Sequence, residues 1–458
     1  MATINGTTDN DTLTSLAAAD ILNGLEGDDT LYGGAGSDSL NGGDDDDILA
    51  GGGEADALNG GAGTDTADYS ASAAGVTVSL ASGTGTGGDA QGDTLTQVEN
   101  LTGSAQGDSL TGDGNANQMD GGAGDDLLDG QAGTDTLLGG AGNDTLTGGA
   151  GADVLNGGAD TDTASYALSA SGVTVSLASG TGSGGDAQGD TLTQVENLTG
   201  SAQGDNLTGD GNANQLDGGA GGDQLDGQAG TDTLLGGNGN DTLTGGAGAD
   251  ALNGGADIDT ASYGASSAGV TVSLLTGTGT GGDAQGDTLT LIENLAGSAQ
   301  GDSLTGDAAA NFLDGRAGID TLDGGAGADQ LTGGANIDTA SYGSASGAVA
   351  ASLAAGTGSL GDALGDVFSG IENLSGSGFG DVLTGDAGAN QLDGQSGNDT
   401  LDGGGDADSL NGGSGNDVLT GGAGADSLNG GSNTDTASYA TSAAAVTVSL
   451  ASGTGTGG

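Results

Sequence analysis

The sequence predicts an all-β solenoid, and three observations support this fold class. A nine-residue unit recurs in register along the chain, Gly occurs 107 times in 458 residues, and most units carry one Leu at a fixed position. A short fixed period is typical of stacked coils in which each repeat contacts its neighbours. Low aromatic content and a net charge of −64 would otherwise indicate disorder. Disordered segments have no reason to keep a strict register, so we favour the solenoid.

Residues 139–147, with the sequence GGAGNDTLT, illustrate the unit. Gly at the first, second and fourth positions is expected to adopt positive φ and to bend the chain tightly. The sixth residue, Asp144, offers a carboxylate. The last three residues alternate polar and apolar, which predicts a short strand with Leu146 pointing inward. Each unit therefore encodes a turn, an acidic side chain and one core residue.

Blocks of regular units alternate with interludes that depart from the pattern. The second unit, 15–23, has no Gly and is interpreted as a capping turn. Each complete interlude has an alternating strand, such as 76–80, and a degenerate unit, such as 88–96 with Asp93. The predicted segments are 1–68 (capping segment and block 1), 69–102 (interlude 1), 103–165 (block 2), 166–199 (interlude 2), 200–262 (block 3), 263–296 (interlude 3), 297–341 (block 4), 342–375 (interlude 4), 376–438 (block 5) and 439–458 (a truncated interlude 5).

The spacing of the interludes indicates the size of one coil. The tyrosines that open them, Tyr69, Tyr166, Tyr263, Tyr342 and Tyr439, are separated by 97, 97, 79 and 97 residues. The short spacing lacks 18 residues because block 4 has five units where the other complete blocks have seven. If a coil uses two units, loss of a single unit would put every later strand on the wrong face, whereas loss of two keeps the parity. We therefore predict 18-residue coils with two short parallel sheets, Leu between them, and acidic turns along both edges.

The unit resembles the nonapeptide G-G-x-G-x-D-x-U-x, with U apolar, of the RTX (repeats-in-toxin) calcium-binding proteins, and the resemblance covers about three quarters of the chain. It implies a right-handed parallel β-roll with Ca²⁺ ions between turns one coil apart. The implied ligands are backbone carbonyls and the sixth-position Asp. The residues carried over are Asp29, Asp38, Asp47, Asp126, Asp135, Asp144, Asp153, Asp223, Asp232, Asp241, Asp250, Asp320, Asp329, Asp399, Asp408, Asp417 and Asp426. The alternative is that these acids only solvate turns, which is disfavoured because stacked carboxylates about 5 Å apart would repel.

Some units depart from this pattern. Asn occupies the sixth position of the second unit in each later block, and a neutral amide is a poorer ligand for Ca²⁺. These positions are Asn117, Asn214, Asn311 and Asn390. An acidic residue replaces the fourth-position Gly at Asp45, Glu54, Asp160 and Asp257. We expect weak or empty calcium sites at the former and an altered turn at the latter.

Two other residue types recur once in each complete interlude. Each Tyr follows a unit whose core residue is Ala, so we interpret its ring as filling the space that Leu leaves. A Glu recurs in the interludes at Glu99, Glu196, Glu293 and Glu372. A catalytic role for it is an alternative, but recurrence in a structural repeat favours a structural role. Arg316, the only basic residue, is interpreted as surface decoration.

Composition narrows the function classes. Without His or Cys, zinc sites and the familiar nucleophile–base pairs are unavailable. Paired carboxylates could cleave a glycoside, but the chain has no Trp and three Phe to stack on a sugar, so we expect no enzymatic activity. The large negative net charge excludes nucleic acid as a binding partner and disfavours binding to anionic membranes. No apolar run predicts a membrane span, and the first ten residues lack the features of a signal peptide.

We expect a secreted, extracellular structural protein that folds on binding Ca²⁺ and forms a rod, filament or surface layer. Self-association is the expected partner interaction, with a cell-surface glycan or another matrix protein as alternatives. The alternative function is a calcium-binding accessory or secretion module of a larger secreted enzyme or adhesin. Ice binding is a weaker third option, because no outward position is uniformly Thr or Asn. The resemblance implies type I secretion with a C-terminal signal, so we expect the natural chain to continue beyond Gly458.

Overall fold

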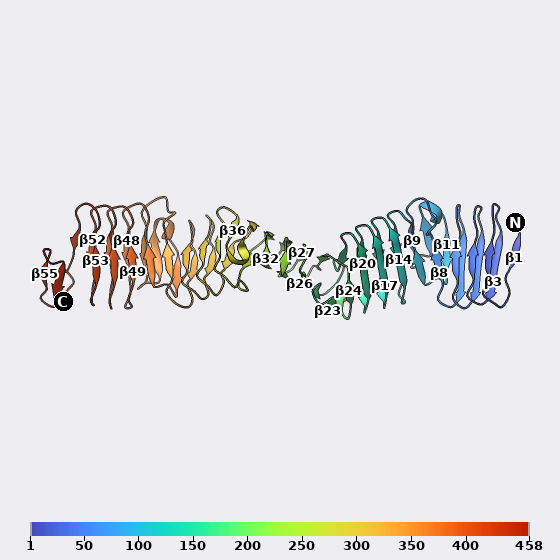
Figure 1. Ribbon diagram of the computed structural model, residues 1–458, viewed down its shortest axis with the longest axis horizontal. Helices are drawn as coiled ribbons and strands as arrows, with labels where there is room; N and C mark the ends of the chain where they lie inside the picture. The colour runs from blue at the N-terminus through green and yellow to red at the C-terminus, as the bar shows by residue number, and fades with distance from the viewer. Residues whose placement is uncertain (1, 457–458) are drawn as a thin grey trace. The chain divides into compact units, whose positions relative to one another are not determined.

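The computed structural model describes residues 2–456, and it is an all-β solenoid in this range. Its helical elements are four single 3₁₀ turns, η1 (Gly88–Ala90), η2 (Gly185–Ala187), η3 (Gly282–Ala284) and η4 (Gly361–Ala363). The chain divides into two compact units, one reaching Gln228 and including Leu235–Asn238, the other comprising Ala229–Leu234 and the chain from Gly239 onward. In each unit the strands lie side by side as stacked rungs (Figure 1).

The coil of the first unit has 18 residues, as predicted. Thr3 pairs with Ile21, and Leu22 with Leu40, in parallel register. Successive strands alternate between two sheets, so each coil contributes one strand to each. The strands of the first sheet are β1 (Thr3–Asn5), β3 (Ile21–Glu26), β5 (Ser39–Asp44), β7 (Ala57–Ala62), β13 (Ser109–Thr111), β15 (Leu127–Asp129), β18 (Thr145–Thr147), β21 (Thr163–Ser165), β25 (Asn197–Thr199) and β27 (Gln215–Ala220). Those of the second are β2 (Thr12–Thr14), β4 (Thr30–Tyr32), β6 (Ile48–Ala50), β8 (Thr66–Asp68), β12 (Asn100–Thr102), β14 (Gln118–Ala123), β17 (Thr136–Ala141), β20 (Val154–Ala159), β26 (Asn206–Thr208) and β28 (Gln224–Asp226).

The core of each unit is a column of apolar side chains between the two sheets. Because alternate residues of a strand point to opposite faces, the middle residue of each three-residue strand faces inward. Leu137, Leu146 and Leu155 are fully buried, for example, while their strand neighbours are partly or fully exposed. One Leu per strand is a thin core, so its burial alone offsets little of the backbone entropy lost on folding.

Each complete interlude adds a hairpin to one sheet. In the first, β9 (Thr77–Ser79), β10 (Thr84–Thr86) and β11 (Thr94–Thr96) lie between β7 and β13. Strand β11 continues the parallel stack from β7, β9 pairs in parallel with β13, and β10 runs antiparallel between them. The nonapeptide pattern does not predict this antiparallel strand, because its Gly85 has no Leu-like core signature.

The second interlude places its hairpin in the other sheet. Its strands β22 (Thr174–Ser176), β23 (Thr181–Ser183) and β24 (Thr191–Thr193) connect β20 to β26. The odd number of units in block 2 is the reason, because the last strand before each interlude then alternates between the sheets. Two short strands, β16 (Ala132–Gly133) and β19 (Ala150–Gly151), pair in parallel with each other and link successive turns.

The second unit repeats this architecture, with coil register such as Leu322 to Ala340 and Leu392 to Leu410. One sheet holds β33 (Ala251–Ala256), β39 (Ser303–Thr305), β41 (Thr321–Asp323), β43 (Thr339–Ser341), β47 (Asn373–Ser375), β49 (Gln391–Asp393), β51 (Ser409–Asn411), β53 (Ser427–Asn429) and the hairpin β35 (Thr271–Ser273), β36 (Thr278–Thr280), β37 (Thr288–Thr290). The other holds β31 (Thr242–Thr244), β34 (Thr260–Ser262), β38 (Asn294–Ala296), β40 (Phe312–Asp314), β42 (Gln330–Thr332), β48 (Val382–Thr384), β50 (Thr400–Asp402), β52 (Val418–Thr420), β54 (Thr436–Ala437) and the hairpin β44 (Ala350–Ser352), β45 (Thr357–Leu360), β46 (Val367–Ser369). Outside these stacks lie β29 (Ala229–Gly230), β32 (Ala247–Gly248), β55 (Thr447–Ser449) and β56 (Thr454–Thr456), while β30 (Thr233–Asn238) has residues in both units.

Among residues 2–456, no helix has the length and apolar character needed to cross a membrane.

Candidate metal centre

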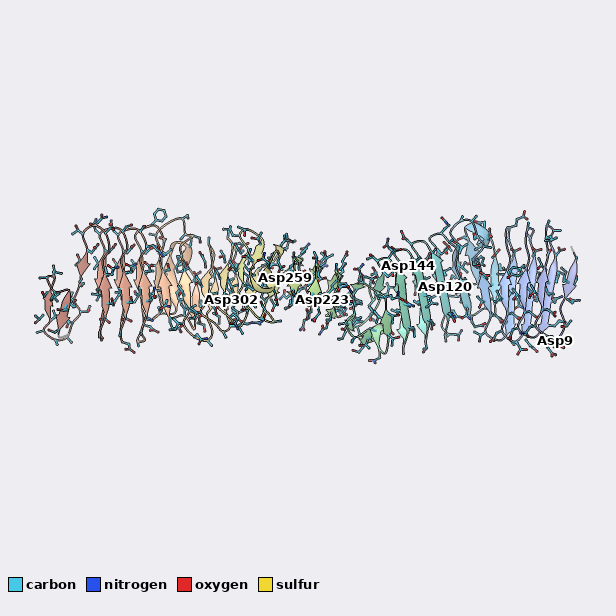
Figure 2. The ribbon with its side chains drawn as sticks, in the orientation of Figure 1. Asp9, Asp120, Asp144, Asp223, Asp259 and Asp302 are labelled. Atoms are coloured by element: carbon cyan, nitrogen blue, oxygen red, sulfur yellow. The ribbon has the colours of Figure 1, made fainter. Side chains whose placement is uncertain are left out.

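The sixth-position aspartates form ladders along both edges of each unit. The backbone N–H of Asp29 donates to Oδ1 of Asp47 at 2.8 Å, and that of Asp47 donates to Oδ1 of Asp65 at 2.8 Å. The same bond joins Asp126 to Asp144 at 2.8 Å. One oxygen of each carboxylate therefore accepts a hydrogen bond from the preceding coil, which fixes the side chain in the turn. Figure 2 labels Asp144, which is buried among the strands, and Asp9, which is exposed in a turn.

In many of these turns the second carboxylate oxygen, Oδ2, is buried and has no hydrogen-bond partner in the protein. An acceptor left in this state costs several kcal/mol if its charge is not compensated. The feature recurs at Asp29, Asp38, Asp47, Asp56, Asp65, Asp126, Asp135, Asp144, Asp153, Asp162, Asp250, Asp259, Asp320, Asp329, Asp338, Asp399, Asp408 and Asp417. A systematic series of half-satisfied, buried carboxylates is the donor set that a cation would complete.

The first-position glycine makes room for this oxygen. A Cβ at Gly24 would lie 2.1 Å from Oδ2 of Asp29, and one at Gly139 would lie 2.3 Å from Oδ2 of Asp144. The prediction that this glycine is needed for positive φ is wrong, because φ in that range occurs at the second and fourth positions, as at Gly140 (109°) and Gly142 (129°). Glycine is required at the first position because a side chain there would collide with the aspartate carboxylate.

Burial raises the pKa of these carboxyl groups. Desolvation is the largest cause, and it outweighs the backbone N–H bond that lowers the pKa. The pKa of Asp47, Asp56, Asp126 and Asp329 rises to about 7. It rises to about 6 at Asp65, Asp135, Asp162, Asp320 and Asp399. Without a cation, the fold therefore holds these groups in an environment that favours the protonated form.

The structure places all seventeen predicted ligands in equivalent turns. Sixteen of them are buried, while Asp426, near the end of block 5, is partly exposed. Five further acids, Asp56, Asp65, Asp162, Asp259 and Asp338, share the buried, unpartnered Oδ2 and were not among the predicted ligands. The sequence signal that could have identified them is an Asp at the sixth position. It is present even in units whose core residue is Ala or whose fourth residue is acidic.

The departing units fall into two groups. The amide of Asn117 has protein partners on both atoms, since Oδ1 accepts from the N–H of Asp113 at 2.8 Å and Nδ2 donates to the carbonyl of Glu99 at 2.7 Å. By contrast, the acidic residues at the fourth position keep positive φ, 79° at Asp45 and 83° at Asp160. The expected change in turn geometry is therefore small, although these side chains adopt a conformation that L-residues disfavour.

The recurrent Glu and Tyr make structural contacts. Oε2 of Glu99 accepts the N–H of Asp65 at 2.9 Å and so takes the place of an aspartate in the ladder. Tyr69 and Ala67 are both buried, as the core-filling interpretation of the tyrosine requires. Its hydroxyl also donates to Asp93, a contact that the sequence reasoning missed. Arg316 is partly exposed, with Nε 4.0 Å from Oδ2 of Asp314.

These donors fit a hard cation such as Ca²⁺, which takes six to eight oxygen ligands. No group of three or more His, Cys, Asp or Glu side chains in residues 2–456 is arranged to hold a metal by itself. The carboxylates would therefore act with backbone carbonyls of the Gly-rich turns. When bound, Ca²⁺ would supply the charge compensation that the buried Oδ2 atoms require.

Fold and turns together define a parallel β-roll with repeated acidic turns. The family model of the RTX calcium-binding nonapeptide repeat matches residues 3–31, 32–67, 97–128, 129–164, 194–225, 226–261, 292–322, 305–340, 367–401, 375–410 and 402–437. This is more than half of the chain, which therefore belongs to the RTX calcium-binding repeat family. Such repeats are typical of secreted proteins. A comparison with curated proteins finds no significant match.

Proposed function

We propose that this chain is an extracellular structural protein whose β-roll forms when Ca²⁺ fills the acidic turns. The observation that supports the proposal is the series of buried Oδ2 atoms without a protein partner. The net charge of −64 and the thin Leu core leave the metal-free fold without a large stabilising term. Binding free energy then becomes folding free energy.

Calcium concentration would control where the chain folds. Loose oxygen sites of extracellular proteins have dissociation constants of about 10⁻⁴–10⁻³ M, so they stay empty in the cytosol and fill outside the cell. A chain that is unfolded inside the cell suits export through a narrow type I secretion channel. Folding outside the cell would then prevent its return.

The assembled form would be a filament or a surface layer. Repeated coils with acidic edges offer many equivalent surfaces, and Ca²⁺ between such edges would reduce their mutual repulsion. We include in the proposal that the chain is not an enzyme, which its lack of His and Cys supports. Sedimentation velocity in millimolar Ca²⁺ and in chelator tests assembly. The proposal expects calcium-dependent oligomers, whereas a folded monomer at high concentration in Ca²⁺ would contradict it and favour the accessory-module alternative.

A further inference from the structure

One aspartate in each complete interlude differs from the regular sixth-position acids. Asp93, Asp190, Asp287 and Asp366 occupy this position in the degenerate units. Their Oδ1 atoms accept the ladder hydrogen bond as usual, for example from the N–H of Asp56 to Asp93 at 2.8 Å. Their Oδ2 atoms, however, each accept a tyrosine hydroxyl. The four pairs are Tyr69–Asp93 (3.1 Å), Tyr166–Asp190 (3.0 Å), Tyr263–Asp287 (3.1 Å) and Tyr342–Asp366 (2.8 Å).

The hairpin of the interlude brings each pair together. Tyr166 directly follows β21, and the chain then passes through β22 and β23 before β24 returns to pair with β20. This return places Asp190, 24 residues later, against the phenol. The ring is 2% exposed, so its hydroxyl needs a buried acceptor. The hydroxyl thus supplies a donor to the one oxygen that regular turns leave without a protein partner.

In the ladders that start after an interlude, the side chain of the first member also has protein hydrogen-bond partners. Oδ2 of Asp108 accepts the N–H of Ser104 at 2.5 Å, and Oδ1 accepts the Ser104 hydroxyl at 3.0 Å. On the other edge, the ladder starts at Asn117, whose amide is satisfied on both atoms. A ladder such as Asn117, Asp135, Asp153 and Asp190 is therefore closed by protein hydrogen bonds at both ends and has unpartnered oxygens at its two inner members.

We propose that the tyrosine hydroxyls are built-in substitutes for calcium, so that Asp93, Asp190, Asp287 and Asp366 bind no ion and each ladder that ends at one of them is an independent calcium column. The hydroxyl donates to a carboxylate oxygen in a direction that a cation would otherwise take. A phenol and a Ca²⁺ ion cannot both take that direction. The interludes thereby divide the calcium-binding turns of these ladders into separate segments.

The inference rests on the proposed calcium binding, and single Asp→Asn substitutions in the full-length chain separate the two. Asn at position 190 can keep the bond from Asp153 through Oδ1 and donate from Nδ2 to the Tyr166 oxygen. Asp190→Asn should therefore bind as many Ca²⁺ ions as the wild type, counted by native mass spectrometry at just-saturating Ca²⁺. The matched control, Asp135→Asn in a regular turn of the same ladder, should lose at least one ion.

Loss of an ion from Asp190→Asn to the same extent as from Asp135→Asn would overturn the inference while leaving calcium binding intact. No loss from Asp135→Asn would instead contradict the proposed role of the sixth-position acids. Asp93→Asn repeats the test in another ladder.

Tyr166→Phe supplies the converse measurement. It leaves Oδ2 of Asp190 buried without its donor, as in the regular turns, so the variant should bind one more Ca²⁺ ion than the wild type. Tyr439→Phe is the control, because Tyr439 has no hydrogen bond to a carboxylate in the described part of the chain and is 38% exposed. An unchanged number of bound Ca²⁺ ions in Tyr166→Phe would overturn the inference.

Discussion

The backbone N–H of Asp126 lies 2.8 Å from Oδ1 of Asp144, one coil further along the solenoid. This bond fixes the position of each carboxylate relative to the preceding turn, and it leaves Oδ2 of Asp144 buried without a partner. The same side chain thus stabilises the stacking of coils through one oxygen, and we propose that its other oxygen binds a cation. The stacking of coils and the proposed calcium binding therefore depend on the same residues.

The coil length predicts the effect of deletions in block 2. Removing residues 139–156, which form one whole coil, should give a shorter but folded solenoid. Removing 139–147 alone should destabilise it, because later strands would then fall in the wrong sheet. Loss of one buried Leu contact typically costs about 2–5 kcal/mol. Thermal unfolding in Ca²⁺ compares the two, and equal melting temperatures would contradict the 18-residue coil.

Substitution of the first-position glycine should destabilise the fold, because a side chain there would crowd Oδ2 of the aspartate. A Cβ at residue 139 would lie 2.3 Å from Oδ2 of Asp144 and 2.5 Å from the carbonyl oxygen of Gly157. Gly139→Ala should therefore reduce stability by about 1–3 kcal/mol and weaken calcium binding. Gly114→Ala is the control, since a Cβ added there would have no atom within 4 Å. Chemical denaturation in Ca²⁺ measures both, and a tolerated Gly139→Ala would show that the turn does not constrain the carboxylate.

Much of this arrangement could be predicted from sequence because the repeat fixes it locally. The nine-residue period gives the strand positions, the inward Leu and the acidic turn, and the 18-residue deletion in block 4 gives the coil. The Tyr166–Asp190 pair could not be predicted in this way, because it joins residues 24 positions apart through the antiparallel strand β23. The reason for the first glycine was also missed, because it depends on where the Asp144 carboxylate points and not on the glycine's own backbone.

The raised pKa values predict that acid stabilises the metal-free fold. The folded-state pKa of Asp47 and Asp126 is about 7, against about 4 in an unfolded chain. The folded state therefore binds more protons, so the stabilisation is fully present below about pH 4 and is lost as the pH rises through about 7. Calcium-free protein should gain β-structure when the pH is lowered from about 8 to about 5. Circular dichroism measures this, and a loss of β signal on acidification would contradict the assigned burial of the carboxylates.

Saturating Ca²⁺ provides the control for this experiment. Coordinated carboxylates are already compensated, so lowering the pH over the same range should not increase the β signal. Protons and Ca²⁺ would instead compete for the same oxygens, and metal binding should release protons. A similar acid-induced gain in both conditions would indicate that surface charge, and not the sixth-position acids, dominates the pH dependence.

The central claim is that Ca²⁺ binding forms the solenoid, and a calcium titration followed by far-ultraviolet circular dichroism tests it most directly. We expect little β signal in excess chelator and a cooperative rise at about 10⁻⁴–10⁻³ M Ca²⁺, because each coil stacks on its neighbours. Mg²⁺ at the same concentrations should give a smaller change, since it loses its hydration water reluctantly. A β signal that is already complete in chelator would contradict the claim.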